Sequence, residues 1–177
     1  GMEVLGFDPF VNQVLFSDNE IKITDIDEVV SESDFITLHM PLNPETNNLF
    51  DYDRFKKMKS TAYIINVARG GIINESDLAR VLNEGVINGA AIDVFDTEPL
   101  SKDSPLLEAK NILLSPHLGA STKEAKEGVS KAICEQIRDY LHEQKLTNVV
   151  NMPVSSLSVL KEIQPFLDLG ELLGNLI

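Results

Sequence analysis

Apolar runs alternate with stretches of helical periodicity along most of this sequence. The apolar runs are short, and proline or a polar residue follows most of them. Strands that alternate with helices imply βαβ units, whose strands pair in parallel. The pattern therefore predicts an α/β fold with a doubly wound, mostly parallel sheet. Strands are expected at 3–7, 21–23, 35–40, 62–67, 86–95 and 112–114, and helices at 25–33, 52–58, 74–84, 122–144 and 164–177.

The composition indicates a globular domain with an acidic surface. The chain has 177 residues, enough for a domain with its own core, and a net charge of -13 that disfavours binding to nucleic acid or anionic membranes. Because it contains neither a membrane-span pattern nor a signal-peptide pattern, the expected location is the cytoplasm. A single cysteine, Cys134, excludes an internal disulfide, and its apolar neighbours predict that it is buried. No metal site is predicted.

One histidine follows an apolar run directly. Residues 112–114 are apolar, Ser115 and Pro116 end the run, and His117 comes next, before Gly119 and a long helical pattern. Open α/β sheets bind their ligands outside the carboxyl ends of the strands. His117 is therefore expected at the ligand-binding edge of the sheet.

An arginine follows another strand in the same way. Arg69 stands after the apolar run 62–67, and Gly70 and Gly71 allow a tight backbone path close to a ligand. The planar guanidinium suits the binding of a carboxylate or a phosphate. A surface arginine beside a turn is an equally good interpretation of this stretch alone.

Acidic residues lie within and directly after the strand predicted at 86–95. Asp93 interrupts that apolar run, where a buried carboxylate is costly without a partner. The turn at 96–99 contains Glu98, and a solvated acidic loop would be its usual explanation. Because parallel strands end at one edge, Arg69, Glu98 and His117 can converge there. Together they suit the oxidation of a hydroxyl group beside a carboxylate, with His117 as the base, Glu98 orienting it and Arg69 holding the carboxylate.

Three motifs extend this interpretation to a family. Residues 66–71 (NVARGG), 93–99 (DVFDTEP) and 115–122 (SPHLGAST) occur in the order found in the D-isomer-specific 2-hydroxyacid dehydrogenases, which the chain resembles over nearly its whole length. The resemblance implies a Rossmann-like fold, NAD as cofactor and hydride transfer with a D-2-hydroxy acid. The expected substrate is 3-phosphoglycerate, at the start of serine biosynthesis.

The resemblance also implies roles for individual residues. Arg69, Glu98 and His117 match the catalytic positions. Asp8 matches the acid that binds the adenosine ribose, and its charge would favour NAD over NADP, although before Pro9 it is by itself a common turn former. The positions expected to line the cofactor are Asp8, Met40, Val67, Ala68, Arg69, Asp93, His117, Gly119 and Ala120.

The glycine-rich pyrophosphate motif of the family is absent from this sequence. In the family it follows the first strand, whereas Gly1 stands just before the second, so the sheet is expected to lack its first βα unit. That strand usually lies at the centre of the sheet, and its loss should separate the strands at 3–7 and 21–23 from the others. The chain is therefore expected to be part of a longer enzyme and to be inactive alone.

Two parts of the complete enzyme are expected in this chain. Residues 1–147 would be an N-terminally incomplete NAD-binding domain, and residues 148–177 would return to a substrate domain or lead into a further domain. The apolar face predicted at 164–177 needs a partner, and a homodimer or homotetramer is expected. The alternative function is a non-catalytic assembly or NAD-sensing module. A generic α/β hydrolase is disfavoured because the Gly-x-Ser-x-Gly turn is absent.

Overall fold

The computed structural model describes residues 1–11, 21–119, 121–143, 145–149 and 157–175. The chain forms two compact units, Gly1–Gly119 and Ala120–Ile177. The first unit contains two parallel sheets, and the second contains two long helices. The boundary expected after residue 147 concerns the domains of a complete enzyme and stays a prediction.

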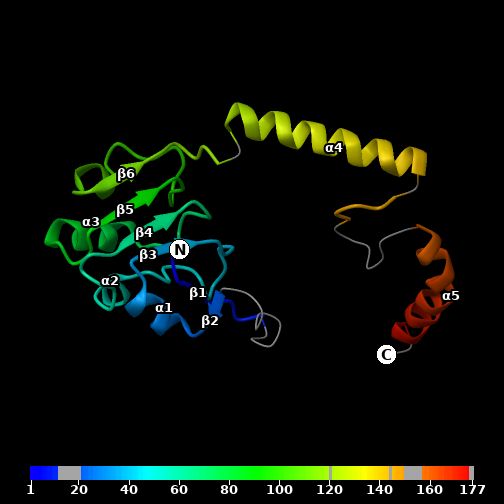
Figure 1. The fold of residues 1–177 in the computed structure, drawn as a ribbon, viewed down its shortest axis with the longest axis horizontal. Coiled ribbons are helices and arrows are strands. Elements are labelled where there is room, and N and C mark those ends of the chain that lie inside the picture. Colours follow the sequence, from blue (N-terminus) through cyan, green and yellow to red (C-terminus); the bar gives the residue numbers. More distant parts are fainter. Residues whose placement is uncertain (12–20, 120, 144, 150–156, 176–177) are drawn as a thin grey trace. The chain divides into compact units, whose positions relative to one another are not determined.

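A four-stranded parallel sheet organises the first unit (Figure 1). The strand order is β3 (Phe35–Leu38), β4 (Tyr63–Asn66), β5 (Gly89–Ile92) and β6 (Ile112–Leu114). Strands β3, β4 and β5 are shorter than the apolar runs predicted at 35–40, 62–67 and 86–95, whereas β6 has the predicted bounds. The parallel pairing confirms the α/β fold predicted from the alternating pattern.

The first two strands form a sheet of their own. β1 (Val4–Gly6) pairs in parallel with β2 (Ile21–Ile23). Within the described part of the chain neither strand joins the larger sheet. This separation agrees with the prediction that a strand lying between β1 and β3 in the complete fold is not supplied by this sequence.

Short polar side chains start the helices of the first unit. In α1 (Ile26–Glu32) Asp25 accepts a hydrogen bond from the N–H of Glu28 at 2.8 Å. In α3 (Glu75–Glu84) Asn74 accepts from the N–H of Asp77 at 3.0 Å, and Gly85 ends the helix with a φ of 70°. Asp25 and Asn74 are therefore the N-caps of α1 and α3, and Gly85 is the C-cap of α3, the helix that the sequence predicted at 74–84. Between them, α2 (Tyr52–Phe55) is a single turn.

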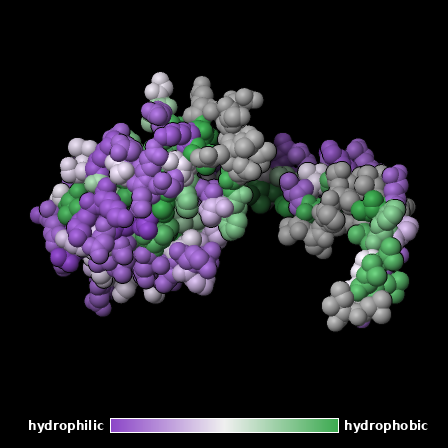
Figure 2. Space-filling model, turned by 90° about the horizontal axis from the view of Figure 1, so that it is seen from below, coloured by the Kyte–Doolittle hydropathy of each residue, from purple (hydrophilic) through white to green (hydrophobic). Residues whose placement is uncertain are grey.

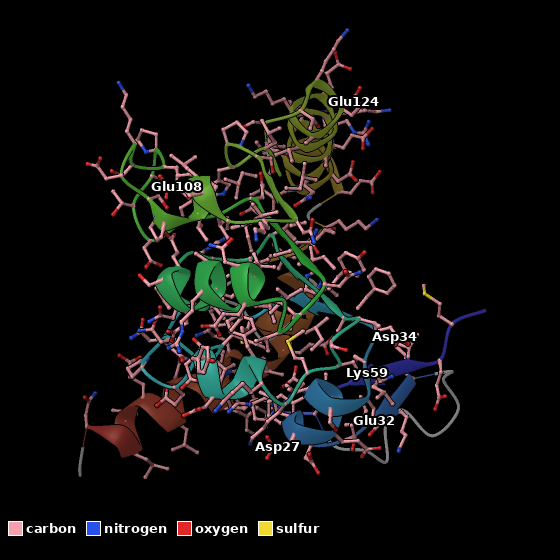
Figure 3. All side chains as sticks on the ribbon, turned by 90° about the vertical axis from the view of Figure 1, so that its left-hand side faces the viewer. Asp27, Glu32, Asp34, Lys59, Glu108 and Glu124 are labelled. Atoms are coloured by element: carbon pink, nitrogen blue, oxygen red, sulfur yellow. The ribbon has the colours of Figure 1, made fainter. Side chains whose placement is uncertain are left out.

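One face of the larger sheet packs against α1, α2 and α3, which Figure 3 views from the helix side. Alternate strand residues turn toward the helices and are almost fully buried, as the two-residue period of a strand requires. Burial of a large apolar side chain contributes roughly 1.5–3 kcal/mol, so this layer is the main source of stability of the unit. Its members include Val30, Ile36, Leu38, Phe55, Ile64, Leu78, Val81, Ala90 and Ile92.

The opposite face of the sheet remains open within the described first unit. Phe35 is 63% exposed, and Leu113 is 69% exposed. The rings of Phe35 and Tyr63 stack on this face with centroids 5.3 Å apart. Parallel sheets are normally covered on both faces, so these apolar side chains belong to a layer that the first unit does not complete by itself.

Exposed ion pairs lie at the outer surface of the helix layer. Asp27 of α1 pairs with Lys57 at 3.1 Å, and Asp34 pairs with Lys59 at 3.2 Å (Figure 3). Glu32 also lies on α1 (Figure 3). Exposed pairs of this kind contribute about 0–1 kcal/mol each, so they serve solubility more than stability.

The second unit contains the longest helix, α4 (Lys123–Glu143), which confirms the helix predicted at 122–144. Thr122 caps it by accepting a hydrogen bond from the N–H of Ala125 at 3.1 Å. None of the described α4 residues is buried. The expectation that Cys134 is buried is therefore wrong, because the residues flanking it form an exposed apolar face.

The last helix, α5 (Leu157–Gly174), begins earlier than the sequence predicted. The apolar face of residues 164–177 predicted a helix that starts at Gln164, whereas α5 starts at Leu157 and Pro165 lies inside it. Apolar side chains line α5, with Phe166 73% and Leu172 65% exposed (Figure 2). No described helix is long and apolar enough to cross a membrane.

Candidate active site

Three strands of the larger sheet end in register. Asn66 of β4 pairs with Ile92 of β5, which pairs with Leu114 of β6. The strands are parallel, so the segments that follow them all begin at the same edge of the sheet. The edge therefore gathers the loops 67–71, 93–99 and 115–119, as the sequence analysis expected.

His117 and Glu98 meet in these loops. The imidazole Nδ1 lies 2.6 Å from Oε2 of Glu98, and both side chains are partly exposed, at 47% and 36%. The second oxygen of Glu98, Oε1, accepts from the N–H of Phe95 at 3.1 Å. The hydrogen bond from His117, followed by that from Phe95, lowers the pKa of Glu98 below its ordinary value. Glu98 is therefore an ionised acceptor that holds the Nδ1 side of the ring.

The backbone of His117 adopts a left-handed conformation. Its φ is 54°, a region that non-glycine residues enter at a cost of about 1–3 kcal/mol. The N–H of His117 donates to the carbonyl of Ser115 at 3.0 Å, which closes the turn. The neighbouring loop contacts therefore hold a strained backbone that directs the imidazole to Glu98.

Asp93 holds the loop on both sides of His117. This carboxylate is buried, with 6% of the residue exposed. Its Oδ1 accepts from the hydroxyl of Ser115 at 2.6 Å and from the N–H of Leu118 at 2.8 Å. Its Oδ2 accepts from the N–H of Gly119 at 3.2 Å. A buried carboxylate requires hydrogen-bond partners, and the loop that carries His117 supplies them to Asp93.

The charge of Asp93 should make stability depend on pH. Burial alone would raise the pKa of Asp93, but the hydrogen bonds from Ser115, Leu118 and Gly119 outweigh burial and lower the pKa below its ordinary value of 3.8. The stabilisation is therefore full above pH 3.8 and is lost as the pH falls through the folded value. We expect Asp93→Asn to lower the free energy of unfolding by about 1–3 kcal/mol at neutral pH, and less in acid. Urea unfolding of both proteins from neutral to acid pH checks this, and a difference independent of pH would contradict it.

Asn66 organises the loop that carries Arg69. It is the last residue of β4, and 2% of it is exposed. Its Oδ1 accepts from the N–H of Ala68 at 3.0 Å, and its Nδ2 donates to the carbonyl of Arg69 at 2.9 Å. No individual role was predicted for Asn66. A polar residue at the end of an apolar run, directly before the arginine loop, was the available signal.

The guanidinium of Arg69 itself is exposed. Its Nη1 donates to the carbonyl of Ala68 at 2.6 Å, which leaves the other guanidinium nitrogens without a partner among the described residues. Arg69 is therefore available to bind an anion at the same edge as His117 and Glu98.

Gly70 brings the arginine loop against the glutamate loop. A Cβ atom at this position would lie 1.9 Å from the carbonyl oxygen of Phe95. The glycine pair was expected to allow close approach to a ligand, whereas at Gly70 the close neighbour is the backbone of the next loop. Gly71 has a φ of 80°, which accounts for the second glycine.

The residues expected to line the cofactor fall into separate groups. Asp93 and Gly119 join the His117 loop, whereas Met40 is partly buried against the core and Val67 is 49% exposed. Ala68 is partly buried in the Arg69 loop. Ala120 lies outside the described residues.

Asp8 follows β1, in the smaller sheet. Its Oδ1 accepts from the N–H of Phe10 at 2.9 Å, which is the turn expected of an aspartate before proline. The residue is exposed, and Oδ2 has no hydrogen-bond partner in the described part of the chain. This oxygen is free to accept a hydrogen bond from a ribose hydroxyl, which is the contact that a nucleotide cofactor requires of an acidic residue here. No group of three or more described His, Cys, Asp or Glu residues is arranged to hold a metal ion.

Comparison with known proteins places this geometry in a family. Residues 1–119 match the model of the D-isomer specific 2-hydroxyacid dehydrogenase, NAD binding domain. A D-3-phosphoglycerate dehydrogenase from Synechocystis is 45% identical over 177 residues, which cover the whole chain and 32% of that protein. One from Methanocaldococcus jannaschii is 40% identical over the whole chain and 34% of its own length. This chain thus spans about a third of these relatives.

A solved structure gives the same result. The D-isomer specific 2-hydroxyacid dehydrogenase of Lactobacillus delbrueckii ssp. bulgaricus, in its NAD-complexed form, superposes with a TM-score of 0.69 at 25% identity. The superposition covers 84% of this chain and 48% of that one. The chain therefore belongs to the D-isomer specific 2-hydroxyacid dehydrogenase family and carries its NAD-binding domain over residues 1–119.

Proposed function

We propose that this chain supplies the NAD-binding and proton-transfer part of a dehydrogenase that oxidises D-3-phosphoglycerate. The hydrogen bond between His117 and Glu98 carries the proposal, because it equips an imidazole at the carboxyl edge of the sheet to act as a base. The substrate rests on the names of the relatives from Synechocystis and Methanocaldococcus jannaschii. The cytoplasmic location and the homo-oligomeric state stay predictions.

Proton transfer would use the free side of the imidazole. Nδ1 bonds to the ionised Glu98, so in the neutral ring Nδ1 carries the proton and Nε2 carries the lone pair. Nε2 of His117 would take the proton of the substrate hydroxyl, and Glu98 would stabilise the positive charge that the ring acquires. The same pair would return the proton in the reverse reaction.

The cofactor would supply the hydride acceptor that side chains cannot provide. Asp8, with one carboxylate oxygen free, would bind the adenosine ribose and would repel the extra phosphate of NADP. The remaining positions proposed to hold NAD are Met40, Val67, Ala68, Arg69, Asp93, His117, Gly119 and Ala120.

Arg69 would bind the carboxylate of the substrate. We expect Arg69→Ala to raise the KM for 3-phosphoglycerate about 100-fold, with a smaller change in kcat, since about 3 kcal/mol corresponds to one or two lost charge-assisted hydrogen bonds. Steady-state kinetics of the full-length protein measure both constants. Arg80→Ala is the matched control, because Arg80 is an arginine of α3 that pairs with Glu84 at 2.9 Å. An unchanged KM in Arg69→Ala would contradict the role.

Reduction of NAD by the full-length protein tests the proposed function directly. With D-3-phosphoglycerate, we expect absorbance at the NADH band to rise in proportion to enzyme. If the protein oxidises other D-2-hydroxy acids but not 3-phosphoglycerate, the dehydrogenase activity is correct and the proposed substrate is wrong. Absence of turnover with all of them would overturn the dehydrogenase.

A second candidate, a non-catalytic assembly or NAD-sensing module, is favoured by the exposed apolar side chains of α5. Isothermal titration with NADH separates the candidates when it is combined with the turnover assay. A dehydrogenase binds NADH and turns over, whereas a sensing module binds NADH without turnover. We expect the 177-residue chain alone to bind NADH weakly or not at all.

A further inference from the structure

Glu75 bridges the two ends of the segment that contains Glu98. It is the first residue of α3. Its Oε1 accepts from the N–H of Asp96 at 2.8 Å, and its Oε2 lies 3.5 Å from the hydroxyl of Ser104. Ser104 is buried and is the N-cap of the short 3-10 helix η2 (Pro105–Glu108). One carboxylate thus ties the segment 96–104 to α3 at both ends.

The peptide between Phe95 and Asp96 is held from several sides. Its carbonyl oxygen lies against Gly70, where a Cβ atom would approach to 1.9 Å. Its N–H, that of Asp96, donates to Glu75. The preceding N–H, that of Phe95, donates to Glu98 at 3.1 Å. The orientation of this peptide therefore determines where Glu98 presents Oε2 to His117.

We propose that Glu75 is a positioning residue for the pair formed by Glu98 and His117. This inference rests on the proposed function. Without the carboxylate of Glu75, the N–H of Asp96 would lose its acceptor, and the turn that directs Glu98 would be free to rotate. Proton transfer depends strongly on the placement of the base, so the effect falls on kcat.

The pKa of Glu75 reflects its partly buried position in the fold. Burial, together with the nearby charge of Asp96, raises the pKa of Glu75, whereas the hydrogen bonds from Asp96 and Ser104 lower it and only partly compensate. Partial burial of a carboxylate is unfavourable, and here the hydrogen bond from the N–H of Asp96 offsets part of that cost. This agrees with a carboxylate that orients the turn rather than one that only adds surface charge.

Three variants of the full-length protein test the inference. Glu75→Ala removes both acceptor oxygens, and Glu75→Gln keeps an amide oxygen for the N–H of Asp96. Asp77→Ala is the matched control, because Asp77 lies in the same helical turn and accepts a backbone hydrogen bond, at 3.1 Å, from Tyr52 instead. We expect kcat to fall about 10-fold or more in Glu75→Ala. In Glu75→Gln most of this loss should be absent, and in Asp77→Ala kcat should change less than about 2-fold. The dissociation constant for NADH should change less than about 2-fold in all three.

Hydrogen exchange supplies a measurement that does not depend on turnover. The peptide 93–99 should exchange about 10-fold faster in Glu75→Ala and at the wild-type rate in Asp77→Ala. A Glu75→Ala protein with the kcat and the exchange rate of the wild type would overturn the positioning role. A loss of kcat in Glu75→Gln or in Asp77→Ala equal to that in Glu75→Ala would also overturn it. An inactive wild type would overturn the proposed function, and the exchange rates would then decide alone whether Glu75 orders this turn.

Discussion

His117→Asn is expected to lower the kcat of the full-length dehydrogenase by about 1,000-fold, within the range that a positioned general base contributes. Asparagine can still accept or donate one hydrogen bond near Glu98, but it cannot take a proton near neutral pH. Binding of NADH should weaken far less than kcat falls, because only the cofactor contact of His117 itself is lost. The loop stays held by the hydrogen bonds from Ser115, Leu118 and Gly119 to Asp93. Steady-state kinetics with NAD and 3-phosphoglycerate, together with calorimetric titration of NADH, measure the two effects.

His142→Asn is the matched control for this experiment. His142 is exposed in the last turn of α4 and has no role in the proposed chemistry. Its replacement should leave kcat within about 2-fold of the wild-type value, as expected for a surface substitution. Turnover by His117→Asn at the wild-type rate would show that another group removes the proton.

Gly70→Ala should have the second large effect, on both stability and catalysis. The added methyl group would lie 1.9 Å from the carbonyl oxygen of Phe95, so one of the two loops must move. A clash between backbone segments cannot be relieved by rotation of a side chain, and a loss of about 3 kcal/mol or more in the free energy of unfolding is expected. Because Arg69 and Glu98 flank this contact, kcat/KM should also fall.

Gly128→Ala provides the comparison for this substitution. Gly128 lies in α4, and a Cβ atom there meets no other atom within 4 Å. Alanine favours a helix over glycine by about 1 kcal/mol, so this variant should be as stable as the wild type or slightly more stable. Thermal unfolding of both variants checks the expectation. Equal stability of Gly70→Ala and the wild type would mean that the two loops are not in contact.

Much of the fold follows from local sequence patterns. The helix predicted at 74–84 is α3, and the parallel sheet followed from the alternation of strands and helices. Two predictions about the helices of the second unit were wrong. The last helix begins at Leu157 and not at Gln164, and Cys134 has the apolar neighbours of a buried residue on a helix that is exposed. Such choices depend on contacts that no local pattern contains.

The site was predictable where it depends on strand ends and known motifs. The contact between His117 and Glu98 followed from parallel strands that end at one edge, and the roles of both residues stay predictions. The residues that hold the loops could not be found in this way. Asn66 and Glu75 act through hydrogen bonds to backbone groups, and Ser115 acts through its hydrogen bond to the carboxylate of Asp93. In sequence they resemble an ordinary strand end, helix start and turn.

The geometry of the site depends on the register of three neighbouring strands, so its residues should order and disorder together. Asn66, Ile92 and Leu114 share a line of ladder hydrogen bonds, and the loops that carry Arg69, Glu98 and His117 begin directly after it. A shift of β5 by one residue would keep the sheet paired but would turn Asp93 to the other face, away from the loop it binds. Local opening at these strand ends would therefore abolish the arrangement as a whole, and it would set the fraction of molecules that are competent at any moment.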